Sequence, residues 1–130
     1  MLNQNATISD KPSQHIQNIQ YDKDEYLTSF NTIIKNVDAI AFKVTHKYLI
    51  SQNIKSNPKD FEFIRIKETY KLIIIPEIML IKYFNCLSDI DANKTFKQYA
   101  IYVHPEQNSH PNAKIAFQKL LRAFKAESLY

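Results

Sequence analysis

The 130-residue chain contains no glycine at all. Average usage of about 7% would place roughly nine glycines in a chain of this length. Glycine is the residue that most easily adopts positive φ and lets a ligand approach the backbone closely. The Walker-type phosphate loop, the dinucleotide fingerprint, the G-x-S-x-G elbow and the kinase loop are therefore excluded, because each requires glycine. Left-handed turn positions are expected to fall on Asn and Asp.

Three further absences limit where the protein works. Tryptophan is missing, and Cys86 is the single cysteine, so no internal disulfide can form and a reducing compartment is expected. The first residues lack a charged segment followed by an apolar one, so no signal peptide is predicted. The longest unbroken apolar run, "LIIIP", falls far short of the ~18 residues of a membrane span. A cytoplasmic protein without membrane contact is expected.

The composition itself is that of one ordinary globular domain. Hydrophobic residues make up 45% of the chain and charged residues 23%, in a mass of 15.3 kDa. The net charge of +4 is spread along the sequence, and the densest basic segment is "KLLRAFK" at 119–125. We divide the chain into an N-terminal arm (1–23), a central unit (24–87) and a C-terminal extension (88–130).

The N-terminal arm is polar and carries weak structural signals. Two short β-like pieces, "NATIS" and "HIQNIQY", flank the turn-forming sequence "DKPSQ". A marginal hairpin and an unstructured tail explain this arm equally well.

Residues 24–54 show the clearest periodicity, which predicts a helix of roughly 30 residues. Apolar side chains recur at alternating steps of three and four, the spacing of a heptad seam. Asp22 or Asp24 is placed to cap the helix, and "SNPKD" at 56–60 is placed to end it. The seam is formed by Leu27, Phe30, Ile34, Val37, Ala41, Val44 and Tyr48.

The next segment favours β-strands. Residues 60–68, "DFEFIRIKE", alternate, and residues 70–76 and 78–85 form apolar runs. The short connections at 68–69 and 76–77 predict antiparallel pairing. The expected fold class is therefore α+β, with an antiparallel sheet covered on one face by the long amphipathic helix.

The C-terminal extension is predicted to end in a helix. A polar linker (88–95) precedes "TFKQYAIYV", for which strand and helix both remain open and aromatic content favours the strand. The loop "HPEQNSHP" follows, and Pro111 suits the first turn of a final amphipathic helix.

Candidate chemistry is sparse. His104 and His110 with Glu106 could hold a metal, but their spacing matches no standard zinc pattern, so they are interpreted as loop residues. Cys86 is interpreted as a small buried side chain and not a nucleophile. Asp89 and Asp91 are interpreted as solvated linker residues. No catalytic residue, metal or cofactor is assigned, and an enzyme is not expected.

The basic face of the final helix allows a second interpretation. Lysine, arginine and phenylalanine interleave there, an arrangement able to hold RNA phosphates and stack bases. A small basic subunit of an RNA–protein assembly is therefore the alternative function, although the basic excess is small.

The central unit resembles the roadblock-type (LC7-type) dynein light chain family. The resemblance rests on "DFEFIRIK", "KLIIIPE" and "IMLIKYFN", preceded by a long helix and an Asn-Pro break. It covers residues 24–86, about half of the chain. The sequence departs from the family in lacking a first helix and a glycine in the hairpin turn, and in extending past the usual end.

The resemblance implies a non-catalytic light chain or adaptor of a dynein-like motor. It implies a homo- or heterodimer that holds a helix of the dynein intermediate chain, in the cytoplasm or at the cytoskeleton, with the ciliary axoneme included. Residues 60–68 would be the pairing edge, and the long helices would lie side by side. The interface implied on this chain consists of Phe61, Phe63, Arg65, Ile34, Val37, Ala41, Val44 and Tyr48.

Overall fold

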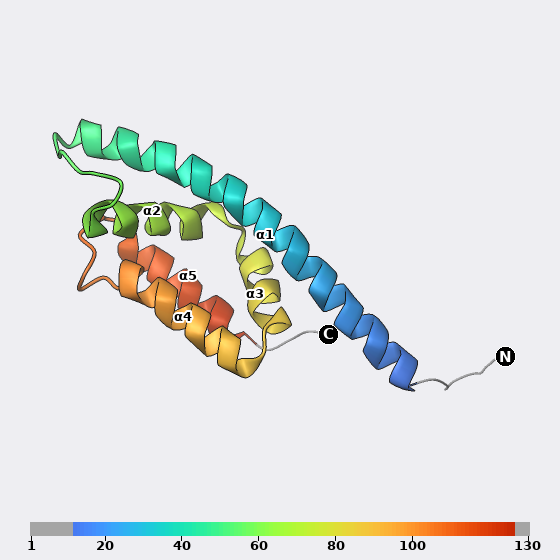
Figure 1. Ribbon diagram of the computed structural model, residues 1–130. Helices are drawn as coiled ribbons and strands as arrows, with labels where there is room; N and C mark the ends of the chain where they lie inside the picture. The colour runs from blue at the N-terminus through green and yellow to red at the C-terminus, as the bar shows by residue number, and fades with distance from the viewer. Residues whose placement is uncertain (1–11, 127–130) are drawn as a thin grey trace.

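The computed structural model describes residues 12–126, with side-chain environments described from residue 22 onward. Within this part the chain forms helices joined by short connections and contains no strand (Figure 1). The helices are α1 (Pro12–Ser51), α2 (Phe61–Ile74), α3 (Glu77–Cys86), α4 (Asp89–Val103) and α5 (Ala113–Lys125).

The expected α+β fold with an antiparallel sheet is wrong. Residues 61–74, predicted to form most of two strands, are one helix, and the predicted strands at 78–85 and 95–103 lie in α3 and α4. The buried positions of α2 include Phe63, Ile66, Thr69 and Leu72, which recur every three residues and mark a helix face. The predicted turn at 68–69 has no residue suited to positive φ, so a tight hairpin had no chemical basis there.

The roadblock-type architecture requires this sheet, so it is wrong as well. The three segments that carried the resemblance are helical, so residues 60–68 offer no strand edge for pairing. The dynein light chain function implied by the resemblance loses this structural support and stays a prediction.

The long helix was predicted in the right place, but its start was not. It begins at Pro12 instead of near residue 24, so neither Asp22 nor Asp24 caps it. The "HIQNIQY" half of the expected hairpin lies inside α1, and the "NATIS" half lies outside the described residues. Asn53 has φ of 56° just after the helix, which confirms that Asn replaces glycine at a left-handed position.

The helices pack in layers (Figure 1). α1 lies along one side and contacts α2 and α3, while α4 and α5 lie against each other on the opposite side. α2 contacts both α4 and α5, and α3 contacts α5. α2 and α3 therefore form a middle layer, separated by a short break at Pro76, which lacks the N–H that a continuous helix would need.

Two hydrophobic clusters hold these layers together. The large core joins all five helices and includes Phe30, Leu72, Leu80, Phe84 and Leu120. The small core lies near the C-terminal end of α1 and buries only Leu49, Phe63 and Ile66. The amphipathic C-terminal helix was predicted in the right place, since it occurs at Ala113–Lys125 and faces the large core. Pro111, however, lies before its N-cap Asn112 and not in its first turn.

Candidate functional site

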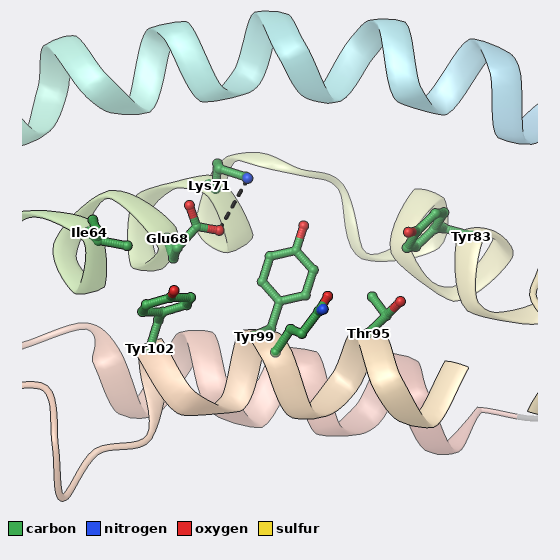
Figure 2. Close-up of a pocket in the computed structure, with 8 residues that line it drawn as sticks. Ile64, Glu68, Lys71, Tyr83, Thr95, Tyr99 and Tyr102 are labelled. Carbon is green, nitrogen blue, oxygen red and sulfur yellow. Dashed lines mark ion pairs between the residues drawn. The ribbon is translucent and has the colours of Figure 1, made fainter. Parts of the chain in front are cut away.

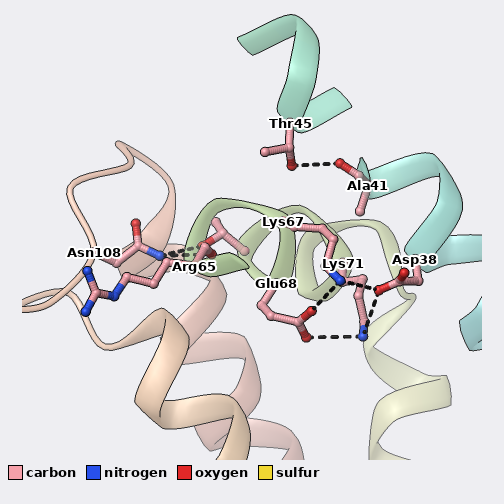
Figure 3. A network of polar contacts seen from close by, with 9 residues as sticks. Asp38, Ala41, Thr45, Arg65, Lys67, Glu68, Lys71 and Asn108 are labelled. Carbon is pink, nitrogen blue, oxygen red and sulfur yellow. Dashed lines mark hydrogen bonds and ion pairs between the residues drawn. The ribbon is translucent and has the colours of Figure 1, made fainter. Parts of the chain in front are cut away.

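The connection from α4 to α5 is a loop, residues 104–112, whose centre is fixed by Asn108. This side chain is buried, and its Nδ2 lies 2.9 Å from Thr69 Oγ1, 3.0 Å from the carbonyl oxygen of Tyr102 and 3.1 Å from that of Arg65. Its Oδ1 accepts a hydrogen bond from the His110 amide at 2.9 Å. Figure 3 shows Asn108 reaching toward α2. One side chain thus joins α2, the end of α4 and the loop.

His110 fixes the far end of the loop. Its Nδ1 accepts a hydrogen bond from the Asn112 amide at 3.0 Å, so this nitrogen carries no proton. The neutral ring therefore has its proton on Nε2, which lies 2.9 Å from the Tyr70 hydroxyl. The Tyr48 ring packs at 4.5 Å between centroids. Burial lowers the pKa of His110 below its usual 6.5, which keeps the ring in the neutral form that this geometry requires.

The near end of the loop is fixed in the same way and presents an exposed tip. His104 Nδ1 accepts a hydrogen bond from the Glu106 amide at 3.2 Å, and its ring meets Phe117 edge-on. Pro105, Glu106 and Gln107 are exposed. We call residues 105–107 the loop tip. Its backbone is held from beneath while its side chains remain available to a partner.

α4 leads directly into this loop and carries an exposed stripe. The helix begins at a good cap, because Ser88 Oγ accepts from the Asp91 amide, and Asp89 and Asp91 lie in its first turn, where the helix dipole favours acidic groups. Side chains at i, i+4, i+7 and i+11 then share one solvent-facing side. The α4 stripe is formed by Ile90, Lys94, Lys97 and Ile101.

The charges of the α4 stripe differ from those of α5. Neither Lys94 nor Lys97 takes part in a salt bridge among residues 22–126. On α5, Lys119 Nζ instead donates to the carbonyl oxygens of Ile73 and Ile75, and Arg122 pairs with Glu77 at 2.7 Å. The basic residues of the final helix, considered for RNA binding, are Lys114, Lys119, Arg122 and Lys125, and two of them are thus engaged within the protein.

A cleft lies on the other side of α4, facing α2 and α3 (Figure 2). Its volume is about 470 Å³. The lining combines three tyrosines and one isoleucine with a few polar and charged groups, and consists of Ile64, Glu68, Lys71, Tyr83, Thr95, Gln98, Tyr99 and Tyr102.

The charged wall of the cleft belongs to an ion-pair network between α1 and α2 (Figure 3). Lys67 lies 2.9 Å from Asp38, and Lys71 lies 3.1 Å from Glu68 and 3.4 Å from Asp38. Burial acts to raise the pKa of Asp38, but hydrogen bonds and charge attraction from Lys67 and Lys71 outweigh it and hold that pKa below its usual value. Two acids and two bases balance, so the network adds no net charge.

The residues predicted to form a dimer interface differ in how far the chain buries them. Phe63, Val37 and Ala41 are buried inside this single chain. Ile34, Val44, Arg65 and Tyr48 are half-buried, and Phe61 is 61% exposed. The heptad seam of α1 therefore packs largely on its own bundle, and dimerisation through it stays a prediction.

The candidate metal and nucleophile residues do not assemble into a catalytic arrangement. In the described part of the chain no three His, Cys, Asp or Glu side chains lie together in a way that would hold a metal. Cys86 is half-buried, and burial raises the pKa of its thiol, which disfavours the reactive thiolate. His104 and His110 instead fix the loop.

Sequence reasoning missed the α4 stripe and the role of Asn108. The stripe follows from helical spacing at once, but only after 95–103 is read as helix. Asn108 gives no signal in sequence, because its partners lie 39 and 43 residues away on α2.

Comparisons with known proteins give one short likeness. No protein-family model and no solved structure matches the chain. DnaJ homolog subfamily C member 14 of Rattus norvegicus is 53% identical over 36 residues, and the proteins of that name from Bos taurus and Homo sapiens are 50% identical over 36. The matched segment spans 28% of this chain and 5% of each relative. Within the described residues no helix is long and apolar enough to cross a membrane.

Proposed function

We propose that this chain is a non-catalytic, DnaJ-like protein-binding module whose interface is the α4 stripe together with the loop tip. The observation that carries the proposal is that the α4 stripe and the loop tip are continuous. The stripe ends at Ile101, and the exposed tip begins at Pro105, directly after the last turn of α4. Helix and loop thus offer one connected surface, and the short likeness to DnaJ homolog subfamily C member 14 supports a function of that class.

The fixed loop favours binding over chemistry. A partner that binds a mobile loop must overcome the entropy lost when the loop becomes ordered, whereas a loop that is already ordered avoids most of that cost. Asn108 and His110 supply this order from inside the protein. Rigid scaffolds with exposed loop residues are typical of recognition sites.

The chemistry of the α4 stripe indicates an acidic partner surface. Lys94 and Lys97 lie between two isoleucines that are 80% and 63% exposed. Exposed apolar groups supply contact area, and unpaired cations supply attraction and orientation toward carboxylates. A partner with an acidic rim around an apolar patch complements this arrangement.

The test is a charge reversal with a matched control. Lys94→Glu/Lys97→Glu reverses the charge of the α4 stripe. Lys43→Glu/Lys47→Glu makes the same charge change on the exposed side of α1. Each double variant lowers the net charge from +4 to 0. Tagged chains are used to capture partners from native cell extract at low and high salt, and the captured proteins are quantified by mass spectrometry.

The proposal expects the α4 variant to lose its partner by at least about tenfold, with the α1 variant close to wild type. Capture should also weaken as salt rises, because screening reduces the attraction between exposed charges. Equal capture by both variants would contradict the assignment of the surface. Capture that disappears on nuclease treatment would favour the RNA-binding alternative.

A further inference from the structure

The cleft on the opposite side of α4 has the size and lining of a separate binding site. Its volume of about 470 Å³ falls within the ~300–1,000 Å³ typical of ligand pockets. It is open to solvent and is bounded by α2 on one side, α4 on the other and Tyr83 of α3 at one end (Figure 2). An open trough of this kind suits an extended chain better than an enclosed small molecule.

Three aromatic rings line the trough, and packing fixes their positions. Tyr83 stacks on Phe30 at 4.1 Å between centroids. Tyr99 lies beneath the Lys71 ammonium, 5.6 Å from its ring centre. Tyr102 contacts Phe61 at 6.3 Å. Rings anchored in this way lose little freedom when a ligand packs against them.

The polar groups of the trough favour a ligand that offers acceptors. In Figure 2 the Tyr99 hydroxyl points into the trough. Burial, together with the charge of Glu68, raises the pKa of Tyr99, so its phenol remains a hydrogen-bond donor at neutral pH. Gln98 adds amide donors and Thr95 a hydroxyl.

The charge of the trough is balanced. Glu68 and Lys71 are the charged residues in the lining, and they pair with each other at 3.1 Å. Lys67 and Asp38 pair behind them. A strongly acidic or basic ligand therefore gains no net attraction, and an uncharged ligand is favoured.

We propose that this trough, lined by Tyr83, Tyr99 and Tyr102, binds an uncharged proline-rich segment in the polyproline II conformation. Such a segment has free carbonyl acceptors and few N–H donors, and its flat rings pack on aromatic side chains. The dimensions agree. Thr95, Gln98, Tyr99 and Tyr102 span eight residues of α4, or seven steps of about 1.5 Å, about 10 Å in all. A P-x-x-P unit spans three steps of about 3.1 Å, or about 9 Å.

Titration of the full chain with a capped proline decamer tests the proposal, with chemical shifts of backbone amides followed by NMR. The expected shifts cluster at α4 residues 95–102 and around Tyr83. A capped Gly-Ser decamer is the control ligand and should leave these shifts unchanged. Shift changes spread evenly over the protein, none at all, or equal changes with both peptides would overturn the proposal.

Variants on the two sides of α4 separate this site from the proposed partner interface. Tyr102→Ala should weaken peptide binding at least about tenfold, and Tyr102→Phe by a smaller factor, because it removes the hydroxyl alone. Ile101→Ala changes the neighbouring residue on the α4 stripe and should leave peptide binding intact while weakening partner capture.

Loss of peptide binding in Ile101→Ala, or its retention in a folded Tyr102→Ala, would contradict the assignment to the trough. If Tyr102→Ala does not fold, Gln98→Ala at an exposed position gives the same test, with a loss of a few fold expected. Unchanged peptide binding in Gln98→Ala and Tyr102→Phe together would then overturn the proposal.

Discussion

The two cores of the bundle are built from different interactions. The large core buries ten apolar residues, nine from the five helices and Ile75 from the break between α2 and α3, and aromatic pairs such as Phe96–Phe124, stacked at 4.4 Å, surround it. The small core buries three, and the space beside it is filled by the loop with its buried Asn108 and His110. Apolar packing tolerates changes of pH, whereas hydrogen bonds to buried side chains depend on the protonation of their partners. The loop tip, one part of the proposed interface, therefore lies at the end of the molecule that polar contacts hold.

The largest effect is expected at the large core. Leu80→Ala removes a side chain with 0% exposure and should lower the free energy of unfolding by about 3 kcal/mol, through lost burial and the cavity left behind. Urea unfolding followed by circular dichroism measures it. Ile78→Ala, at a 60% exposed position of the same helix, should cost no more than about 0.5 kcal/mol. Similar losses in both variants would contradict the placement of α3.

Asn108→Ala is expected to be the next largest change. It leaves the Thr69 hydroxyl, the carbonyl oxygens of Arg65 and Tyr102 and the His110 amide without this partner, at a cost of about 2 kcal/mol. Gln107→Ala, one residue away and exposed, is the control and should be close to neutral. Equal stability of the Asn108 variant and wild type would show that the loop is not held as described.

Acidification should first destabilise the end of the molecule that contains the loop at residues 104–112. The pKa of His110 is lower in the folded protein than its usual 6.5, so the unfolded chain binds the proton more readily. The contribution of His110 to stability is therefore complete above pH 6.5 and is lost as pH falls from there toward the folded pKa. His110→Gln should remove this part of the pH dependence in unfolding experiments. His46→Gln should keep it, and the same slope in both variants would contradict the prediction.

The smallest effect is expected on the surface. Arg122 forms a two-point pair with Glu77, with distances of 2.7 and 3.1 Å, yet the Arg122 side chain is 57% exposed and the Glu77 side chain 37%. Water and salt screen such pairs. Arg122→Ala should leave the thermal unfolding midpoint nearly unchanged. A large drop would mean that the pair fixes α5 against α3 more firmly than its exposure indicates.

The sequence predicted the two amphipathic helices well and the middle of the chain poorly. Apolar residues at steps of three and four identified most of α1, and the apolar stripe after Pro111 identified α5, although Pro111 itself lies before the helix. In α2 and α3 the frequent isoleucines favoured strands, because β-branched residues prefer them. Propensity is weak, however, and tertiary packing overrides it. The lack of glycine was the better guide, since tight hairpins depend on positive-φ residues that "ET" and "PE" do not supply.

The candidate site was less predictable than the fold. The α4 stripe is recognisable only when its segment is known to be a helix, because helical spacing is what brings Lys94, Lys97 and the two isoleucines to one side. The His residues of the loop were expected to be loop residues, which the structure confirms. Each of these rings accepts a hydrogen bond from the amide two residues ahead, but spacing does not reveal the contact that also holds the His110 ring, its hydrogen bond to Tyr70 across 40 residues.

The most direct test of the account is amide hydrogen exchange in the loop, measured by NMR at neutral pH. The His110 and Asn112 amides donate to Asn108 Oδ1 and His110 Nδ1, so they should exchange much more slowly than in an unfolded chain. In Asn108→Ala both should exchange at least about tenfold faster, while amides in the middle of α5 should change far less. Rapid exchange at both positions in the unmodified protein would contradict the claim that this loop is held in place for binding.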